Sequence, residues 1–97
     1  MSVISETLAS NASATTEYFS APSNGWHVFD VEATWGGGTV KLQRKGPNGT
    51  AIDIGGEATM TADGHAMVWL FTDDEIRVNI ATATAVYARL RYSQEGF

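Results

Sequence analysis

Residues 75–81, Glu-Ile-Arg-Val-Asn-Ile-Ala, decide the fold class of this chain because apolar and polar side chains alternate strictly along them. Residues 85–92, Ala-Val-Tyr-Ala-Arg-Leu-Arg-Tyr, repeat the alternation. A β-strand with one buried face requires this period of two, since successive side chains leave opposite faces of the strand. No segment of comparable length repeats at helical spacing. The sequence therefore predicts an all-β protein.

Turn residues divide the rest of the chain into further short strands. Gly, Pro, Asn and Asp recur at close intervals, which is typical of an antiparallel β-sandwich or jelly roll rather than of βαβ units. Asp63-Gly64 predicts a tight hairpin, and Gly36-Gly37-Gly38 predicts a flexible hairpin connection. About eight strands are expected, at residues 18–20, 26–35, 39–45, 50–54, 57–61, 66–72, 75–81 and 85–93.

The apolar positions of these strands predict one shared core. In each long strand the residues of one parity are apolar, and they must face the same layer once the strands pair. A chain of 97 residues has room for a single thin core between two sheets. The expected core residues are Phe29, Val31, Val40, Leu42, Ile76, Val78, Ile80, Val86, Ala88 and Leu90.

The N-terminal segment differs from the rest in composition. Residues 1–15 are rich in Ser, Ala and Thr, and their sizeable apolar side chains are only Val3, Ile4 and Leu8. Such a segment offers little apolar surface to offset the entropy lost on ordering. We interpret it as a flexible arm that becomes ordered on a neighbouring subunit, with a frayed terminus or a short edge strand as the alternative. Residues 16–97 are then a single β-sandwich domain.

Charge and composition limit the classes of partner. The net charge is −5 and the six basic residues are spread along the chain, whereas nucleic-acid binding depends on clustered Lys and Arg. There is no cysteine, and no apolar run approaches the roughly 18 residues of a membrane span. No basic segment followed by an apolar run opens the chain, so no signal peptide is expected. An acidic protein that binds other proteins, and neither nucleic acid nor membrane, fits best.

No motif in the sequence predicts catalysis. The chain has neither a Cys nor a Gly-x-Ser-x-Gly elbow, so no activated nucleophile is expected. Asp73-Asp74-Glu75 offers carboxylates to calcium but lacks the ligand spacing of a calcium loop, and a solvated turn is the favoured interpretation. His27 and His65 are far apart, with no further ligand at zinc spacing. We therefore expect no enzymatic activity, no cofactor and no metal site.

The strand predicted at residues 66–72 is unusual because both of its faces are apolar. One face packs in the core, and the other must be covered by something else. In so small a chain a neighbouring subunit is the natural candidate, so a homo-oligomer is expected, with a trimer favoured. Trp26 opens its own strand beside polar loop residues. The candidate interface residues are Trp26, Met67, Trp69 and Phe71.

Exposed aromatic rings offer a second interpretation, because such rings stack on sugars in many β-sandwich binding modules. Trp26 is the ring best placed for that role. Trp35 and Trp69 occupy apolar strand positions, where an aromatic side chain usually belongs to the core.

Several motifs together resemble small β-sandwich proteins encoded among phage structural genes, such as virion decoration proteins and other head and tail accessory proteins. These motifs are turns and core positions, and they transfer no catalytic residue. They are Trp35-Gly36-Gly37-Gly38-Thr39-Val40-Lys41-Leu42-Gln43, Gly46-Pro47-Asn48-Gly49-Thr50, residues 59–64 and Ile76-Arg77-Val78.

The resemblance implies a phage virion structural protein that is not an enzyme. Such a protein is expected to decorate or cement the capsid surface as a homo-oligomer, with the major capsid protein or another virion protein as its partner. Its location is then the virion, assembled in the host cytoplasm. The alternative is a tail or fibre accessory domain that binds host glycan through exposed aromatics.

Overall fold

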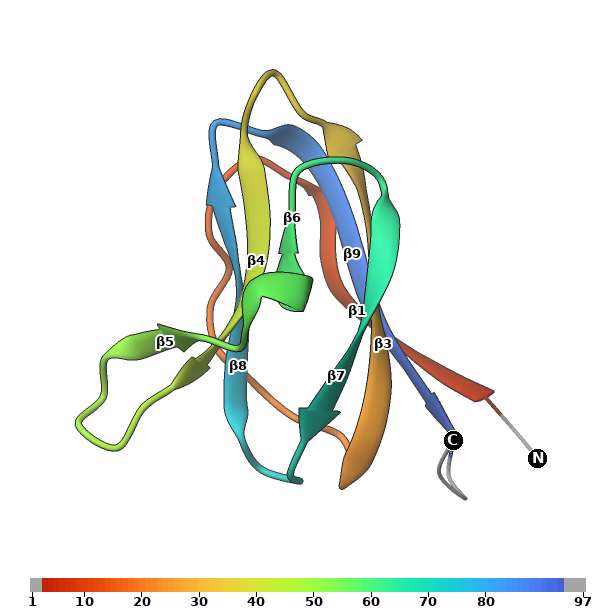
Figure 1. The fold of residues 1–97 in the computed structure, drawn as a ribbon, viewed down its shortest axis with the longest axis vertical. Coiled ribbons are helices and arrows are strands. Elements are labelled where there is room, and N and C mark those ends of the chain that lie inside the picture. The colour runs from red at the N-terminus through yellow and green to blue at the C-terminus, as the bar shows by residue number, and fades with distance from the viewer. Residues whose placement is uncertain (1–2, 94–97) are drawn as a thin grey trace.

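The structure is a computed structural model that describes residues 3–93, and it confirms the all-β sandwich. Two antiparallel sheets face each other (Figure 1). The first sheet has the order β1 (Val3–Ala12), β9 (Thr84–Ser93), β3 (Gly25–Thr34) and β7 (Gly64–Leu70). The second has the order β2 (Phe19–Ser20), β8 (Glu75–Ala81), β4 (Thr39–Lys45) and β5 (Ala51–Asp53), and β6 (Thr59–Met60) also pairs with β4. A short 3₁₀ helix, η1 (Gly56–Ala58), precedes β6.

The core lies between the sheets and contains all ten residues expected there, each at most 9% exposed. Their strands alternate as predicted, so β8 turns Ile76, Val78 and Ile80 inward and leaves Glu75 and Arg77 on the outer side. Burial of such side chains is the main favourable term in folding. The sequence pattern therefore identified the inner faces of β3, β4, β8 and β9 correctly.

The N-terminal arm is the largest difference from the prediction. Residues 3–12 form β1, which pairs antiparallel with β9 and buries Leu8 and Ala9 in the core. The pairing shifts register between Thr7 and Ala9, so two consecutive residues face inward and the alternation is broken. The interpretation as a flexible arm is thus wrong for these residues, and the alternative of an edge strand describes them. Met1 and Ser2 lie outside the described residues.

Two turns predicted as hairpins instead carry the chain between the sheets. β6 pairs with β4 and β7 pairs with β3, so the turn at Asp63-Gly64 leaves one sheet and enters the other. The Asp63 carboxylate fixes this crossing by accepting hydrogen bonds from the backbone N–H of Ala33 at 3.0 Å and from Nε1 of Trp35 at 2.8 Å. The hydrogen bond from Trp35 and then that from Ala33 lower the pKa of this carboxyl below its usual value.

The Gly36–Gly38 turn crosses from β3 to β4 and depends on glycine. Gly36 and Gly37 have positive φ values of 55° and 81°. Gly38 is buried where its backbone passes the β8–β9 turn, and a β-carbon there would overlap with the Ala81 carbonyl oxygen and the Ala83 nitrogen. The prediction of a flexible hairpin is therefore replaced by a tightly packed crossing.

The outer edge of β8 is covered by the segment between β1 and β2. Beyond the short β2 pairing, the Thr16 hydroxyl accepts from the Val78 N–H at 3.0 Å and the Thr15 hydroxyl accepts from the Ile80 N–H at 3.1 Å. Side-chain oxygens thus continue the ladder where no strand pairs, which protects an otherwise open edge. Within residues 3–93 no helix is long and apolar enough to span a membrane.

Candidate functional site

The four candidate interface residues form one cluster, here called the aromatic edge: Trp26, Met67, Trp69 and Phe71. β7 is an edge strand of the first sheet, and its alternation turns Val68 and Leu70 into the core. Met67 and Trp69 therefore point outward, and Phe71 follows the end of the strand. Trp26 pairs directly with Trp69 across the β3–β7 ladder.

The rings of the aromatic edge contact each other edge to face. The ring centroids of Trp26 and Trp69 are 5.6 Å apart with an interplanar angle of 89°, and those of Trp69 and Phe71 are 6.3 Å apart at 78°. These are favourable geometries for aromatic pairs. The four side chains nevertheless remain exposed, at 44% for Trp26, 42% for Met67, 50% for Trp69 and 60% for Phe71. The expectation that Trp69 belongs to the core is therefore wrong, whereas Trp35 packs partly buried against the core.

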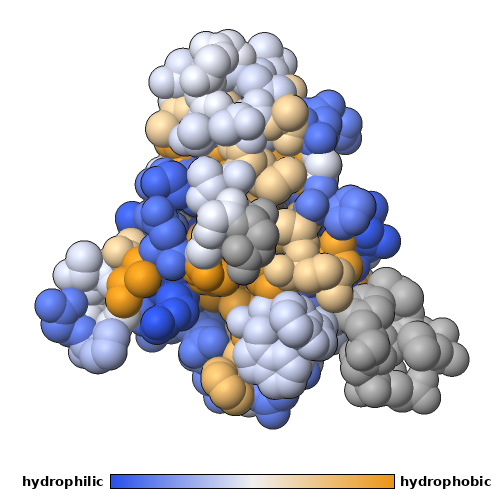
Figure 2. Space-filling model, in the orientation of Figure 1, coloured by the Kyte–Doolittle hydropathy of each residue, from blue (hydrophilic) through white to orange (hydrophobic). Residues whose placement is uncertain are grey.

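A notch lies where the aromatic edge meets the second sheet. It has a volume of about 390 Å³ and is lined by Arg44, Ile54, Trp69, Phe71 and Asp74. In the lower half of Figure 2, apolar and weakly polar residues lie directly beside strongly hydrophilic ones. The Asp74 carboxylate accepts a hydrogen bond from the Phe71 backbone N–H at 3.0 Å, which fixes the turn between β7 and β8. The notch thus combines aromatic walls with one cation and one anion.

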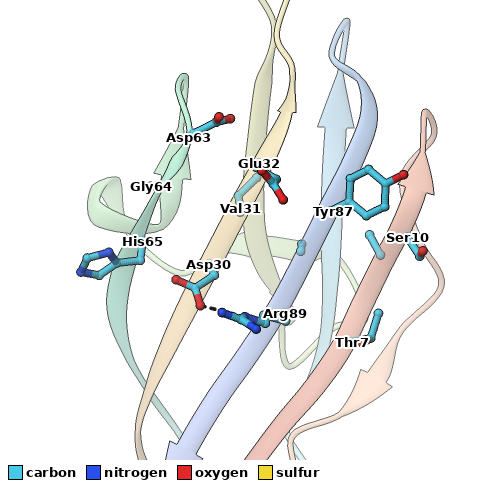
Figure 3. Close-up of a pocket in the computed structure, with 12 residues that line it drawn as sticks. Thr7, Ser10, Asp30, Val31, Glu32, Asp63, Gly64, His65, Tyr87 and Arg89 are labelled. Atoms are coloured by element: carbon cyan, nitrogen blue, oxygen red, sulfur yellow. Dashed lines mark hydrogen bonds and ion pairs between the residues drawn. The ribbon is translucent and has the colours of Figure 1, made fainter.

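A larger groove of about 570 Å³ crosses the outer face of the first sheet (Figure 3). All four strands of this sheet contribute to it, and most of the residues that line it have polar or charged side chains. Its labelled side chains come from β1 (Thr7, Ser10), β3 (Asp30, Glu32), β9 (Tyr87, Arg89), and the start of β7 with the preceding turn (His65, Asp63). Tyr87 is the one large aromatic ring among the lining residues, and it is 46% exposed.

The Asp30 carboxylate in this groove is paired with two guanidinium groups. Arg91 donates to Asp30 at 2.6 Å and Arg89 donates to the same carboxylate at 3.0 Å. Partial burial raises the pKa of the Asp30 carboxyl, but the two guanidinium groups outweigh it and the net pKa is lowered. Asp30 therefore remains ionised and serves as a fixed anchor between two strands rather than as a free acid or base.

The outer face of the second sheet also pairs its charges internally. Lys41 contacts Asp53 at 3.1 Å, and Gln43 donates to the same carboxylate at 2.7 Å. The hydrogen bonds from Gln43 and then Lys41 lower the pKa of Asp53. Across this face Lys45 and Arg77 both lie over the ring of Tyr18, at 5.0 and 5.2 Å from its centroid.

The two histidines lie in different environments. His27 is fully buried, with Nδ1 donating to the Gly25 carbonyl at 2.9 Å and Nε2 3.3 Å from the Ser23 hydroxyl. Desolvation lowers its pKa, although the hydrogen bond to Gly25 opposes this. His65 is exposed at the rim of the groove in Figure 3. Among the described residues no group of three or more His, Cys, Asp and Glu side chains is placed to hold a metal ion.

Sequence reasoning found the aromatic edge but missed the residues that complete the notch. Arg44 and Ile54 lie on or beside strands of the other sheet, and only the packing of the sheets brings them beside Trp69. One signal was available. Arg44 has the same parity in β4 as the inward-facing Val40 and Leu42, so a charge at that position should lie at the rim of the sandwich.

Searches against protein-family models, curated proteins and solved structures gave no match for this chain.

Proposed function

We propose that this protein is a virion structural protein, not an enzyme, that docks on a protein surface through the aromatic edge. The observation that supports docking is the exposure of four large apolar side chains side by side on one edge of an otherwise polar outer face. Trp is strongly enriched at the energetic centres of protein interfaces, and an exposed apolar cluster is a recurrent mark of such sites. The motif resemblance supports the two remaining parts of the proposal. These are the location in the virion and the partner, which is the major capsid protein or another virion protein.

The ring geometry favours a protein over a sugar as the occupant of this edge. Trp26 and Trp69 are perpendicular, so they offer a ridge and a hollow rather than one flat platform. Met67 beside them is flexible and polarisable, which suits contact with irregular apolar surfaces. Mutual packing of the rings also limits the side-chain entropy lost on binding.

The test is co-sedimentation of the purified protein with assembled particles from the genome that encodes it. The wild type is expected to pellet with the particles at saturable stoichiometry. Trp26→Ala with Met67→Ala should weaken binding by roughly 30-fold or more, since hot-spot truncations cost at least about 2 kcal/mol. Tyr87→Ala, on another exposed part of the same sheet, is the matched control and should bind normally. Wild-type protein that stays in the supernatant would overturn the proposal.

A second candidate function, a tail or fibre accessory domain that binds glycan, is favoured by the groove in Figure 3. Its hydroxyl, carboxylate and guanidinium groups surround the half-exposed ring of Tyr87, an arrangement that can hydrogen-bond and stack on a sugar. A glycan array separates the two functions. Binding that is lost in Tyr87→Ala and kept in Trp26→Ala supports this second candidate.

A further inference from the structure

The notch contains a cation that has no partner among the described side chains. Of the six basic residues in the chain, five have an acidic, amide or aromatic partner within the described structure. Arg44 is the exception. It is exposed, and it has no hydrogen bond or ion pair with any described side chain. A guanidinium beside aromatic rings is characteristic of an interface centre, where Arg and Trp are the most enriched residues.

The notch also contains the matching anion. One carboxylate oxygen of Asp74, Oδ2, accepts from the Phe71 N–H, and the other, Oδ1, has no hydrogen-bond partner among the described residues. No ion pair within 4.0 Å joins Arg44 and Asp74 in the structure, although both line the same notch with Trp69 and Phe71. The surface therefore carries a positive group and a negative group with aromatic rings and Ile54 completing its lining.

Such a surface is complementary to itself. A two-fold axis places the same patch of two subunits face to face, so that residue i contacts residue j and j contacts i. Arg44 of each copy would then pair with Asp74 of the other copy, which gives two equivalent ion pairs. Trp69 and Phe71 would pack against their own equivalents around the axis. Both charges gain a partner and the exposed rings lose contact with water.

We propose that two copies of this chain associate about a two-fold axis through the notch, with Arg44 of each copy paired with Asp74 of the other. This inference goes beyond the proposed docking function, and it replaces the trimer expected from the sequence with an isologous dimer. The two-fold contact takes Trp69 and Phe71 from the aromatic edge. Its outward-facing Trp26 and Met67, on the outer face of the first sheet, are then the part that docks on a particle.

Charge exchange between two variants tests the proposed pairing. Wild-type protein in sedimentation velocity at micromolar concentration should have twice the monomer mass of 10.4 kDa. Arg44→Glu alone and Asp74→Lys alone each place like charges opposite one another, so both should be monomers. An equimolar mixture restores both ion pairs and should give a heterodimer. Arg77→Glu, on the outer face of the second sheet, is the control and should remain dimeric.

The outcomes separate cleanly. A wild type that is monomeric, or that has three times the monomer mass, overturns the two-fold contact, as does a mixture that fails to associate although both variants have native circular dichroism. If Asp74→Lys does not fold, Phe71→Cys decides instead. The chain has no cysteine, so a short thiol-specific cross-linker should join Phe71→Cys protomers and leave Tyr87→Cys protomers single. Absence of that cross-link overturns the proposal.

This experiment does not depend on particle binding. A monomer that still co-sediments with particles through Trp26 and Met67 removes the two-fold contact and leaves the docking function intact. A dimer that never binds particles supports the two-fold contact and overturns the docking function.

Discussion

At the scale of single residues, His27 is the titratable group most tightly built into the fold. Its ring is fully buried, contacts Tyr92 with 5.3 Å between centroids, and has a pKa lowered from 6.5 by desolvation. Since Nδ1 must donate to the Gly25 carbonyl, Nε2 of the neutral ring accepts from the Ser23 hydroxyl. Protonation would convert that acceptor into a donor inside the core.

We expect the stability of the protein to fall as the pH drops below about 6.5. The unfolded chain then binds a proton that the folded chain excludes, so folding loses at most about 1.4 kcal/mol per pH unit until the folded-state pKa is reached. Urea unfolding at intervals between pH 5 and pH 7.5 measures this. His27→Gln should flatten the slope, because the ring that takes up the proton on unfolding is then absent. Equal slopes in wild type and His27→Gln would contradict the assignment.

Core and edge apolar residues differ sharply in their expected contributions. Leu90 is fully buried between the sheets, so Leu90→Ala should lower the free energy of unfolding by about 2–5 kcal/mol. Phe71 is 60% exposed, so Phe71→Ala should change the free energy of unfolding of the monomer by about 0.5 kcal/mol or less, as at other surface sites. Denaturant titration of the two variants checks both values. A large loss in Phe71→Ala would show that the aromatic edge supports the fold rather than a partner.

At the scale of the elements, the glycine crossing between β3 and β4 is the least tolerant connection. Gly38→Ala places a β-carbon against the backbone of the β8–β9 turn, which cannot move aside as a side chain could. We expect the free energy of unfolding to fall by roughly 1–3 kcal/mol or more, as is typical of overpacking that displaces the backbone. Gly56→Ala is the matched control, because nothing lies within 4 Å of its β-carbon position. Thermal unfolding followed by circular dichroism compares them, and equal melting temperatures would contradict the packing.

β1 is the element whose role differs most from the sequence-based expectation. Its Leu8 and Ala9 belong to the core, and its backbone pairs with β9 along most of its length. Deleting residues 2–12 should therefore expose apolar surface and one edge of β9, and we expect the melting temperature to fall by more than 10 °C or folding to fail. Differential scanning calorimetry measures the shift. A truncated protein that melts within a few degrees of the full chain would restore the interpretation as an arm.

The sequence revealed strands more readily than their partners. β4 and β8 have the predicted boundaries, because strict alternation and clear turn residues define both. β1 could not be recognised as a strand from the sequence, because its register shifts place two neighbouring apolar residues inward and interrupt the period of two. The crossing at Asp63 was read as a hairpin since Asp-Gly has the same local signature in both settings. Its distinguishing contacts, to Ala33 and Trp35, lie about 30 residues away along the chain.

The candidate site could be predicted only in part, because the alternation along a strand shows which side chains share a face but not what lies against that face. In a strand with two apolar faces, parity shows that one face is outside but not which one, and Trp69 was assigned to both. The structure resolves this because Val68 and Leu70 face the second sheet. His27 shares its parity with Phe29 and Val31, so the alternation of β3 predicts that its side chain is buried, as it is in the structure.

At the scale of the whole molecule, the two ends of the described chain meet in the first sheet. β9 lies between β1 and β3, and it is the last strand in the sequence. Figure 1 shows the start of β1 and the end of β9 at the same side of the molecule, where Val3 pairs with Ser93. Each sheet is therefore assembled from segments far apart in sequence, which is the arrangement that slows folding most.

The central place of β9 sets an order of events during biosynthesis. A ribosome adds about 5–20 residues per second, so β1 and β3 emerge seconds before the strand that belongs between them. Until then both present open hydrogen-bonding edges, with the apolar surface of Phe29 and Val31 still uncovered. The first sheet therefore cannot form before residues 84–93 have left the ribosome, and their emergence supplies the strand that joins β1 to β3. Ribosome-bound chains that stop before Thr84 should therefore be sensitive to protease, and chains extended well past Ser93 should become resistant.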